Sequence, residues 1–88
     1  MNTAALLPDL KLDMGLRSDR FDDRLLSRLR TAEEEITAMG IQLRNTSADR
    51  DLVVMYAGWL WKSRITGEGK PRMLQTALNN RIFGRREG

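Results

Sequence analysis

The chain has 88 residues, including 15 Lys and Arg against 12 Asp and Glu, a net charge of +3, and it contains no cysteine and no histidine. The missing residue types exclude disulfide bonds, thiolate zinc sites and catalysis by a cysteine or a histidine. A single core of this size seldom supplies more than about 3 to 5 kcal/mol, so association with other subunits is the expected source of further stability.

The sequence predicts one all-α domain over residues 1–88, a compact bundle of about four helices separated by glycines. In the first segment, apolar residues alternate from Leu10 to Leu16 as they would in a strand. Pro8 at a first helical position, followed by Leu10 and Met14, instead suits a short helix. We favour the helix.

A long amphipathic helix is predicted next, capped by Ser18 or Asp19, with further acidic residues in its first turn. Its apolar residues recur at spacings of three and four and define one stripe: Phe21, Leu25, Leu29, Ala32, Ile36 and Met39. These spacings indicate a helix of about 20 residues that ends near Gly40.

The third predicted helix is the centre of the bundle. Thr46 or Ser47 can cap it, and its apolar positions between 52 and 61 surround most of the helix axis, so it should be packed on more than one side. Gly58 would allow a neighbour to approach closely. Trp59 shares a face with Tyr56, whereas Trp61 points elsewhere and is a candidate for a subunit interface, where aromatic residues are enriched.

A TGEGKP loop then leads to a fourth helix that starts at Pro71. The residues expected to hold this helix on the core are Met73, Leu74, Ala77, Leu78 and Ile82. Beyond Phe83, residues 84–88 include a glycine hinge and two arginines, Arg85 and Arg86, and form a candidate flexible tail.

The basic character of the chain belongs to its C-terminal part. Residues 1–51 hold 8 basic and 10 acidic side chains, whereas residues 52–88 hold 7 and 2. This asymmetry predicts an acidic partner or nucleic acid for the C-terminal part. The longest apolar run, at 52–61, is half of the roughly 20 residues that a membrane span requires, and the N-terminus resembles no signal peptide, so we expect a cytosolic protein without a membrane partner.

The acidic and glycine-rich stretches do not predict catalysis. The carboxylates of residues 33–35 point about 100° apart on a helix, and Asp22, Asp23, Asp49 and Asp51 lie at helix starts, where acidic residues favour the helix dipole. The GEGK loop lacks the strand, the spacing and the Ser or Thr of a phosphate loop. We therefore expect no metal, no cofactor and no enzymatic activity.

A row of arginines is the strongest candidate for a charged contact. Arg17, Arg20, Arg24 and Arg28 follow one another in steps of three and four, which would place them on one ridge of the second helix. Such a ridge could meet phosphates or the acidic surface of a neighbouring subunit.

The segment DLVVMYAGWLWKSRITGEGKPRMLQTALNNRIF resembles the C-terminal half of the small head–tail connector (adaptor) proteins of tailed bacteriophages and related prophages. The resemblance extends over about residues 6–83 and is most specific at PRML (71–74) and ALNNR (77–81).

This resemblance implies a subunit that assembles into a ring, typically of twelve copies, beneath the portal protein in the neck of the virion after assembly in the host cytoplasm. The ring would join the portal to a neck, stopper or tail-completion protein and leave a channel through which DNA passes without sequence-specific binding. The predicted interface residues are Arg72, Asn79, Asn80, Arg81, Ile82, Phe83, Arg85 and Arg86 at the C-terminus, with Trp61, Arg20, Arg24 and Arg28. We expect Asn79 and Asn80 to make interface or helix-end hydrogen bonds.

The alternative is a small basic helical protein that binds nucleic acid through the arginine ridge and the C-terminal arginines. It predicts an affinity for duplex DNA that falls steeply with salt, whereas a channel subunit should bind DNA weakly.

Overall fold

The computed structural model describes the backbone of residues 1–87 and the side chains of residues 1–83. Its regular elements are all helical: the 3₁₀ turn η1 (Thr3–Leu6) and the helices α1 (Leu7–Met14), α2 (Asp22–Ala38), α3 (Ser47–Thr66) and α4 (Arg72–Glu87). The prediction of an all-α bundle of about four helices is confirmed, and the first segment is a helix as favoured.

Three helices end where a glycine takes a left-handed backbone conformation. Gly15, Gly40 and Gly67 have φ angles of 70°, 89° and 70°, which only glycine adopts without a steric penalty. The positions at which the first three helices stop are therefore as predicted.

The start of α2 differs from the prediction. The helix begins at Asp22, and neither Ser18 nor Asp19 caps it. The Ser18 hydroxyl instead accepts a hydrogen bond from the Arg20 N–H (3.1 Å) within the preceding turn, and Asp19 pairs with Lys11 of α1 (3.0 Å). Asp22 and Asp23 do lie in the first turn of the helix, where their charge favours its positive end.

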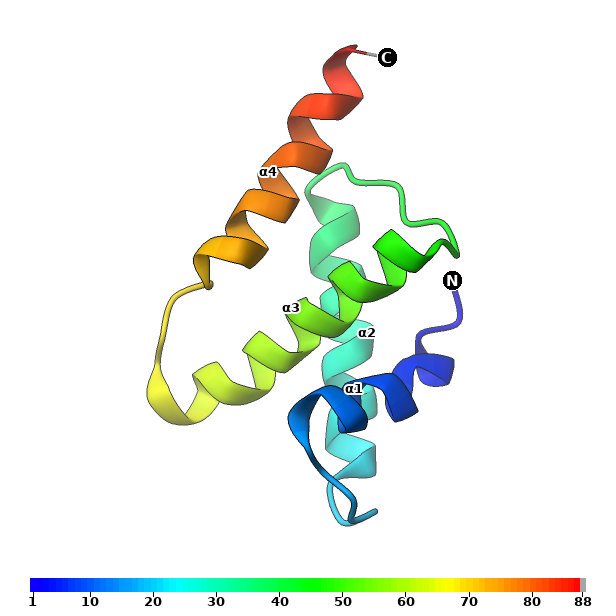
Figure 1. The fold of residues 1–88 in the computed structure, drawn as a ribbon, viewed down its shortest axis with the longest axis vertical. Helices are drawn as coiled ribbons and strands as arrows, with labels where there is room; N and C mark the ends of the chain where they lie inside the picture. Colours follow the sequence, from blue (N-terminus) through cyan, green and yellow to red (C-terminus); the bar gives the residue numbers. More distant parts are fainter. Residues whose placement is uncertain (88) are drawn as a thin grey trace.

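At α3 the prediction is confirmed. The Thr46 hydroxyl accepts from the Asp49 N–H (3.2 Å) and caps the helix. This helix is the centre of the fold: α1, α2 and α4 all pack against it, and η1 packs against α2 (Figure 1).

One continuous core joins these helices. Its buried members are Leu6, Leu10, Leu25, Leu29, Ala32, Ile36, Ile41, Leu52, Val53, Val54, Tyr56, Ala57, Leu74 and Leu78. The predicted stripe of α2 therefore faces the core, with Phe21 and Met39 at its half-buried ends.

Helix α4 is attached along one edge of the bundle. It starts at Arg72, one residue later than predicted, and the Pro71 carbonyl accepts from the Gln75 N–H (2.9 Å). Leu74 and Leu78 are buried, but Met73 is 77% exposed, so the expectation that Met73 holds this helix on the core is wrong. Met73 immediately precedes Leu74, so it lies about 100° around the helix from it, outside the buried edge.

The C-terminal end of α4 projects beyond the other helices (Figure 1). As a result the longest dimension of the molecule is 43 Å, and its radius of gyration, 12.9 Å, exceeds the roughly 12 Å expected for a compact chain of this length.

Candidate functional site

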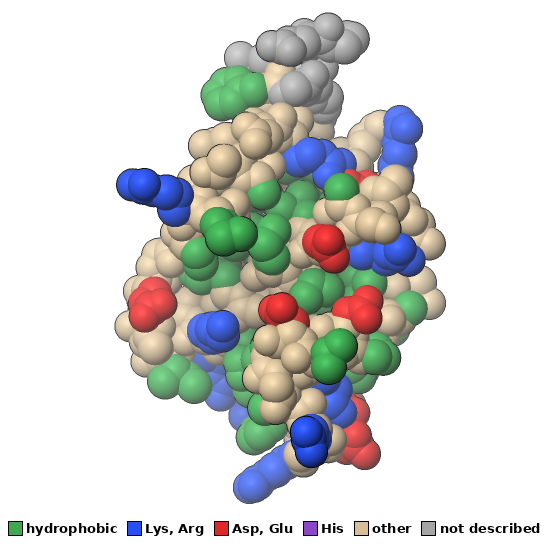
Figure 2. All heavy atoms as spheres, in the orientation of Figure 1, with side chains coloured by type: hydrophobic (Ala, Val, Ile, Leu, Met, Phe, Trp, Pro, Cys, Tyr) green, Lys and Arg blue, Asp and Glu red, His purple; other side chains and the backbone are tan. Residues whose placement is uncertain are grey.

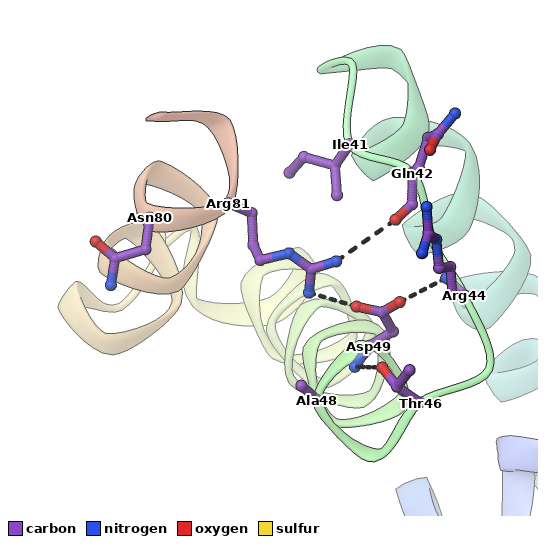
Figure 3. Close-up of a pocket in the computed structure, with 8 residues that line it drawn as sticks. All are labelled: Ile41, Gln42, Arg44, Thr46, Ala48, Asp49, Asn80 and Arg81. Carbon is purple, nitrogen blue, oxygen red and sulfur yellow. Dashed lines mark hydrogen bonds and ion pairs between the residues drawn. The ribbon is translucent and has the colours of Figure 1, made fainter. Parts of the chain in front are cut away.

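The projecting helix α4 is joined to the rest of the molecule at an open groove. The groove, of about 530 Å³, lies between α4, the segment 41–46 and the first turn of α3 (Figure 3). Its lining residues are Ile41, Gln42, Arg44, Thr46, Ala48, Asp49, Asn80 and Arg81.

A buried carboxylate lies at the centre of this groove. The side chain of Asp49 is only 3% exposed, and it pairs with the guanidinium of Arg81 from α4. It also accepts a hydrogen bond from the Arg44 N–H, and the Arg81 guanidinium donates a second hydrogen bond to the Gln42 carbonyl (3.4 Å) (Figure 3). We call this set, Asp49, Arg81, Arg44 and Gln42, the α4 clamp.

The electrostatics of the clamp keep Asp49 charged. Burial alone would raise the pKa of this carboxyl, but the hydrogen bonds from Arg81 and Arg44 and the charge of Arg81 outweigh burial and hold the pKa below its usual range. Because both carboxylate oxygens are engaged, Asp49 acts here as a structural anion that ties α4 to the start of α3.

A second polar contact ties α3 to α2. The hydroxyl of the fully buried Tyr56 donates to the Glu35 carboxylate (2.8 Å). Burial, together with this hydrogen bond and the negative charge of Glu35, raises the pKa of Tyr56 well above its usual value, so the phenol stays protonated.

The loop before α4 is held by Trp59. Its indole N–H donates to the Glu68 carbonyl (3.1 Å), and Lys70 lies over the rings of both Tyr56 and Trp59, 5.4 Å from each centroid. The edge-to-face contact of Tyr56 with Trp59 confirms that these two rings share one face of α3.

The predicted C-terminal interface residues take different positions. Arg81 is turned inward in the clamp, whereas Arg72, Asn79 and Asn80 are exposed on α4. Asn79 accepts from the Gln75 amide within the same helix (3.2 Å), and Asn80 lines the groove, so an interface role for both remains a prediction.

The end of α4 carries the remaining C-terminal candidates. Ile82 packs partly against the core, and Phe83 is 58% exposed. The side chains of Arg85 and Arg86 lie outside those that are described. The backbone of residues 84–87 continues α4, and the flexibility of this predicted tail stays a prediction.

The arginine ridge is only partly realised. Since α2 starts at Asp22, Arg17 and Arg20 precede the helix, and the expectation that they share a helical ridge with Arg24 and Arg28 is wrong. Arg24 is exposed on α2, whereas Arg28 is half-buried and its Nε has no hydrogen-bond partner among the described atoms.

Aromatic contacts connect the residues just before α2 with Trp61 of α3. The ring of Trp61 meets Phe21 edge to face (5.4 Å between centroids), Arg20 lies over Phe21 (5.8 Å), and Arg64 lies over Trp61 (4.9 Å). Trp61 is therefore half-buried at the surface, between the ring of Phe21 and the guanidinium of Arg64.

Sequence reasoning missed the pairing of Asp49 with Arg81. From the sequence, Asp49 was expected to interact with the helix dipole, and Arg81 was expected to contact a neighbouring subunit. The one local signal was Thr46 followed three residues later by an acidic side chain, which is typical of a capping box, but no local pattern pairs residues 32 positions apart.

Among the described residues, no three histidine, cysteine, aspartate or glutamate side chains are grouped so that they could hold a metal ion. Nor does any helix in the described part of the chain combine the length and apolar character that crossing a membrane requires.

Comparisons of the chain with family models, with curated proteins and with solved structures gave no match. The fold therefore defines the class, a small all-helical bundle.

Proposed function

We propose that the chain is a structural subunit of a head–tail connector of a tailed bacteriophage, which assembles into a ring beneath the portal protein. The ring joins the portal to a neck or tail protein, and its central channel lets DNA pass. The proposal combines the sequence resemblance with the architecture, and the observation that carries it is the projecting end of α4.

This end has the properties of a contact arm. It extends beyond the bundle (Figure 1). Its Phe83 is more than half exposed, which is unusual for a large apolar side chain on a small domain. The α4 clamp fixes the arm at Arg81, two residues before Phe83, so the arm leaves the bundle in one direction. Arginines at 85 and 86 follow in the sequence and suit an acidic partner surface.

The test is co-sedimentation of the purified chain with the portal protein encoded alongside it. The unmodified chain is expected to co-sediment. Phe83→Ser and the charge reversal Arg85→Glu/Arg86→Glu should each weaken binding, because they remove an apolar anchor or the complementary charge. Arg30→Glu, at an exposed position of α2, is the matched control and should bind as the unmodified chain does.

The same experiment with duplex DNA separates the alternative. Arg17, Arg20 and Arg24 are exposed near the start of α2, and exposed arginines are the groups that would contact phosphates in the alternative function. The connector proposal would be refuted if the chain did not bind the portal protein but bound duplex DNA. In that case the plot of log binding constant against log salt concentration should steepen by about 0.9 for each phosphate that the chain neutralises.

A further inference from the structure

An exposed leucine surrounded by carboxylates forms one unusual surface. Leu12 of α1 is 83% exposed and lines a hollow with Asp9, Asp13, Asp51 and the buried Val54. Figure 2 shows acidic side chains gathered over α1 and α3 on this face. We call Asp9, Leu12, Asp13 and Asp51 the acidic face.

The acidic face has unfavourable features that a partner could relieve. None of its three carboxylates takes part in the ion pairs of the described residues, and neighbouring like charges repel one another. The exposed Leu12 leaves apolar surface in water, and burying it against a partner would be favourable. A complementary surface would carry cations around an apolar side chain.

The chain itself carries such a surface at the end of α3. Ile65 is 76% exposed and follows Arg64, whose guanidinium stacks on Trp61. Trp61 contacts Phe21, which in turn carries Arg20. We call Arg20, Phe21, Trp61, Arg64 and Ile65 the basic face.

The cations of the basic face are available and already positioned. Neither Arg20 nor Arg64 takes part in an ion pair within the described residues. Stacking on the rings restrains both guanidinium groups, so less side-chain freedom is lost when they meet a carboxylate.

We infer that the acidic face of one copy receives the basic face of a second copy, with Leu12 against Ile65 and the carboxylates against Arg64 and Arg20. The inference rests on the proposed function, because it names the surfaces through which ring subunits would join. The two faces differ, so the contact is head-to-tail and continues from copy to copy, closing into a ring if the rotation closes. Repulsion between like faces disfavours the face-to-face dimer.

Because the chain has no cysteine, single cysteines report this contact directly. Leu12→Cys protein is mixed with Ile65→Cys protein and treated with a short bismaleimide linker at low salt. The control pair replaces Ile65→Cys by Thr76→Cys, at an exposed position of α4. The test pair is expected to crosslink about tenfold faster than the control pair and to lose this advantage as salt screens the charges. Equal rates would overturn the inference.

Charge-reversal variants provide a second test of the contact. Asp13→Lys added to the Leu12→Cys copy, or Arg64→Glu added to the Ile65→Cys copy, should each slow crosslinking to the control rate. Combining the two reversed copies should restore it, because an opposite pair is re-formed. Both residues are exposed, so circular dichroism should show an unchanged fold. If the reversed pair fails to restore crosslinking, charge complementarity is not the basis of the contact.

Portal co-sedimentation of the same variants separates this inference from the proposed function. Crosslinking at the control rate with intact portal binding would overturn the two-face contact alone. Fast crosslinking without portal binding would overturn the connector proposal alone.

Discussion

Breaking the α4 clamp is expected to have unequal effects from its two sides. Arg81→Met keeps most of the aliphatic packing but leaves the carboxylate of Asp49, 3% exposed, without its counter-charge. Removing one partner of a buried pair costs about 3 to 5 kcal/mol, but the Arg81 side chain is 34% exposed, which reduces the expected loss to about 2 to 3 kcal/mol. Asp49→Asn leaves an arginine that water can reach, so about 1 to 2 kcal/mol should be lost.

These losses are large for a small domain whose total stability is on the order of 5 kcal/mol. Urea unfolding, followed by the fluorescence of Trp59 and Trp61, measures them. The double variant should lose about 1 kcal/mol less than the sum of the single variants, because the interaction is removed only once. Asp51→Asn and Arg72→Met, at exposed positions of the same two helices, are the controls. Additivity of the two clamp variants to within about 0.3 kcal/mol would refute the clamp.

The clamp also predicts a pH dependence. The pKa of Asp49 is lower in the folded chain than in the unfolded chain, so as the pH falls the unfolded chain takes up this proton first. The contribution of Asp49 to stability is therefore complete above its unfolded pKa, about 3.9, and is lost as the pH falls through the lower folded value. The non-additivity of the Asp49 and Arg81 variants should therefore decrease as the pH falls through this range. A non-additivity that stays the same at the lowest pH would show that it does not come from the charge of Asp49.

Further predictions concern three residues, Gly58, Gly15 and Tyr56. Gly58→Ala should raise the free energy of unfolding by about 0.5 to 1 kcal/mol, because alanine favours a helix and the added Cβ would lie 3.9 Å from Leu10 Cδ1, an ordinary contact distance. A lower free energy of unfolding in urea would show that the added methyl group does not fit beside Leu10. Gly15→Ala should instead lower it by about 1 kcal/mol, since φ is +70° there, and an unchanged urea midpoint would contradict this. Tyr56→Phe should cost about 1 to 2 kcal/mol by leaving Glu35 without its donor. Because the pKa of Tyr56 is raised on folding, the unmodified chain should also lose stability as the pH rises above about 10, and a Tyr56→Phe chain with the same alkaline loss would contradict this assignment.

The helices and most of the core could be predicted from the sequence because their signals are local. The stripe on α2 and the Thr46 cap depend on residues three or four apart, and the positive φ at Gly15 and Gly67 follows from the need for a left-handed helix end. These features depend on helix geometry and not on which helix packs against which.

The candidate sites could be predicted only in part. The arginine spacing suggested a helical ridge, but Ser18 bonds to Arg20 within the turn, Asp19 pairs with Lys11 of α1, and α2 begins only at Asp22, after Arg20. Met73 is apolar and would suit the core. However, α4 packs along a single narrow edge, and Met73 lies outside that edge and is exposed. Which side chains of a helix are buried depends on where that helix contacts α3 and the other helices.

By itself the sequence determined four helices, their glycine ends, a central apolar helix and a basic C-terminal part, because periodicity, capping and charge are properties of neighbouring residues. The tertiary structure alone decided that Arg81 turns inward to Asp49. It also decided that Trp61 joins Arg64 to Phe21 and Arg20, and that Leu12 stands among carboxylates from two helices. Each of these depends on how helices cross, and a helix crossing brings together side chains whose separation along the chain carries no pattern.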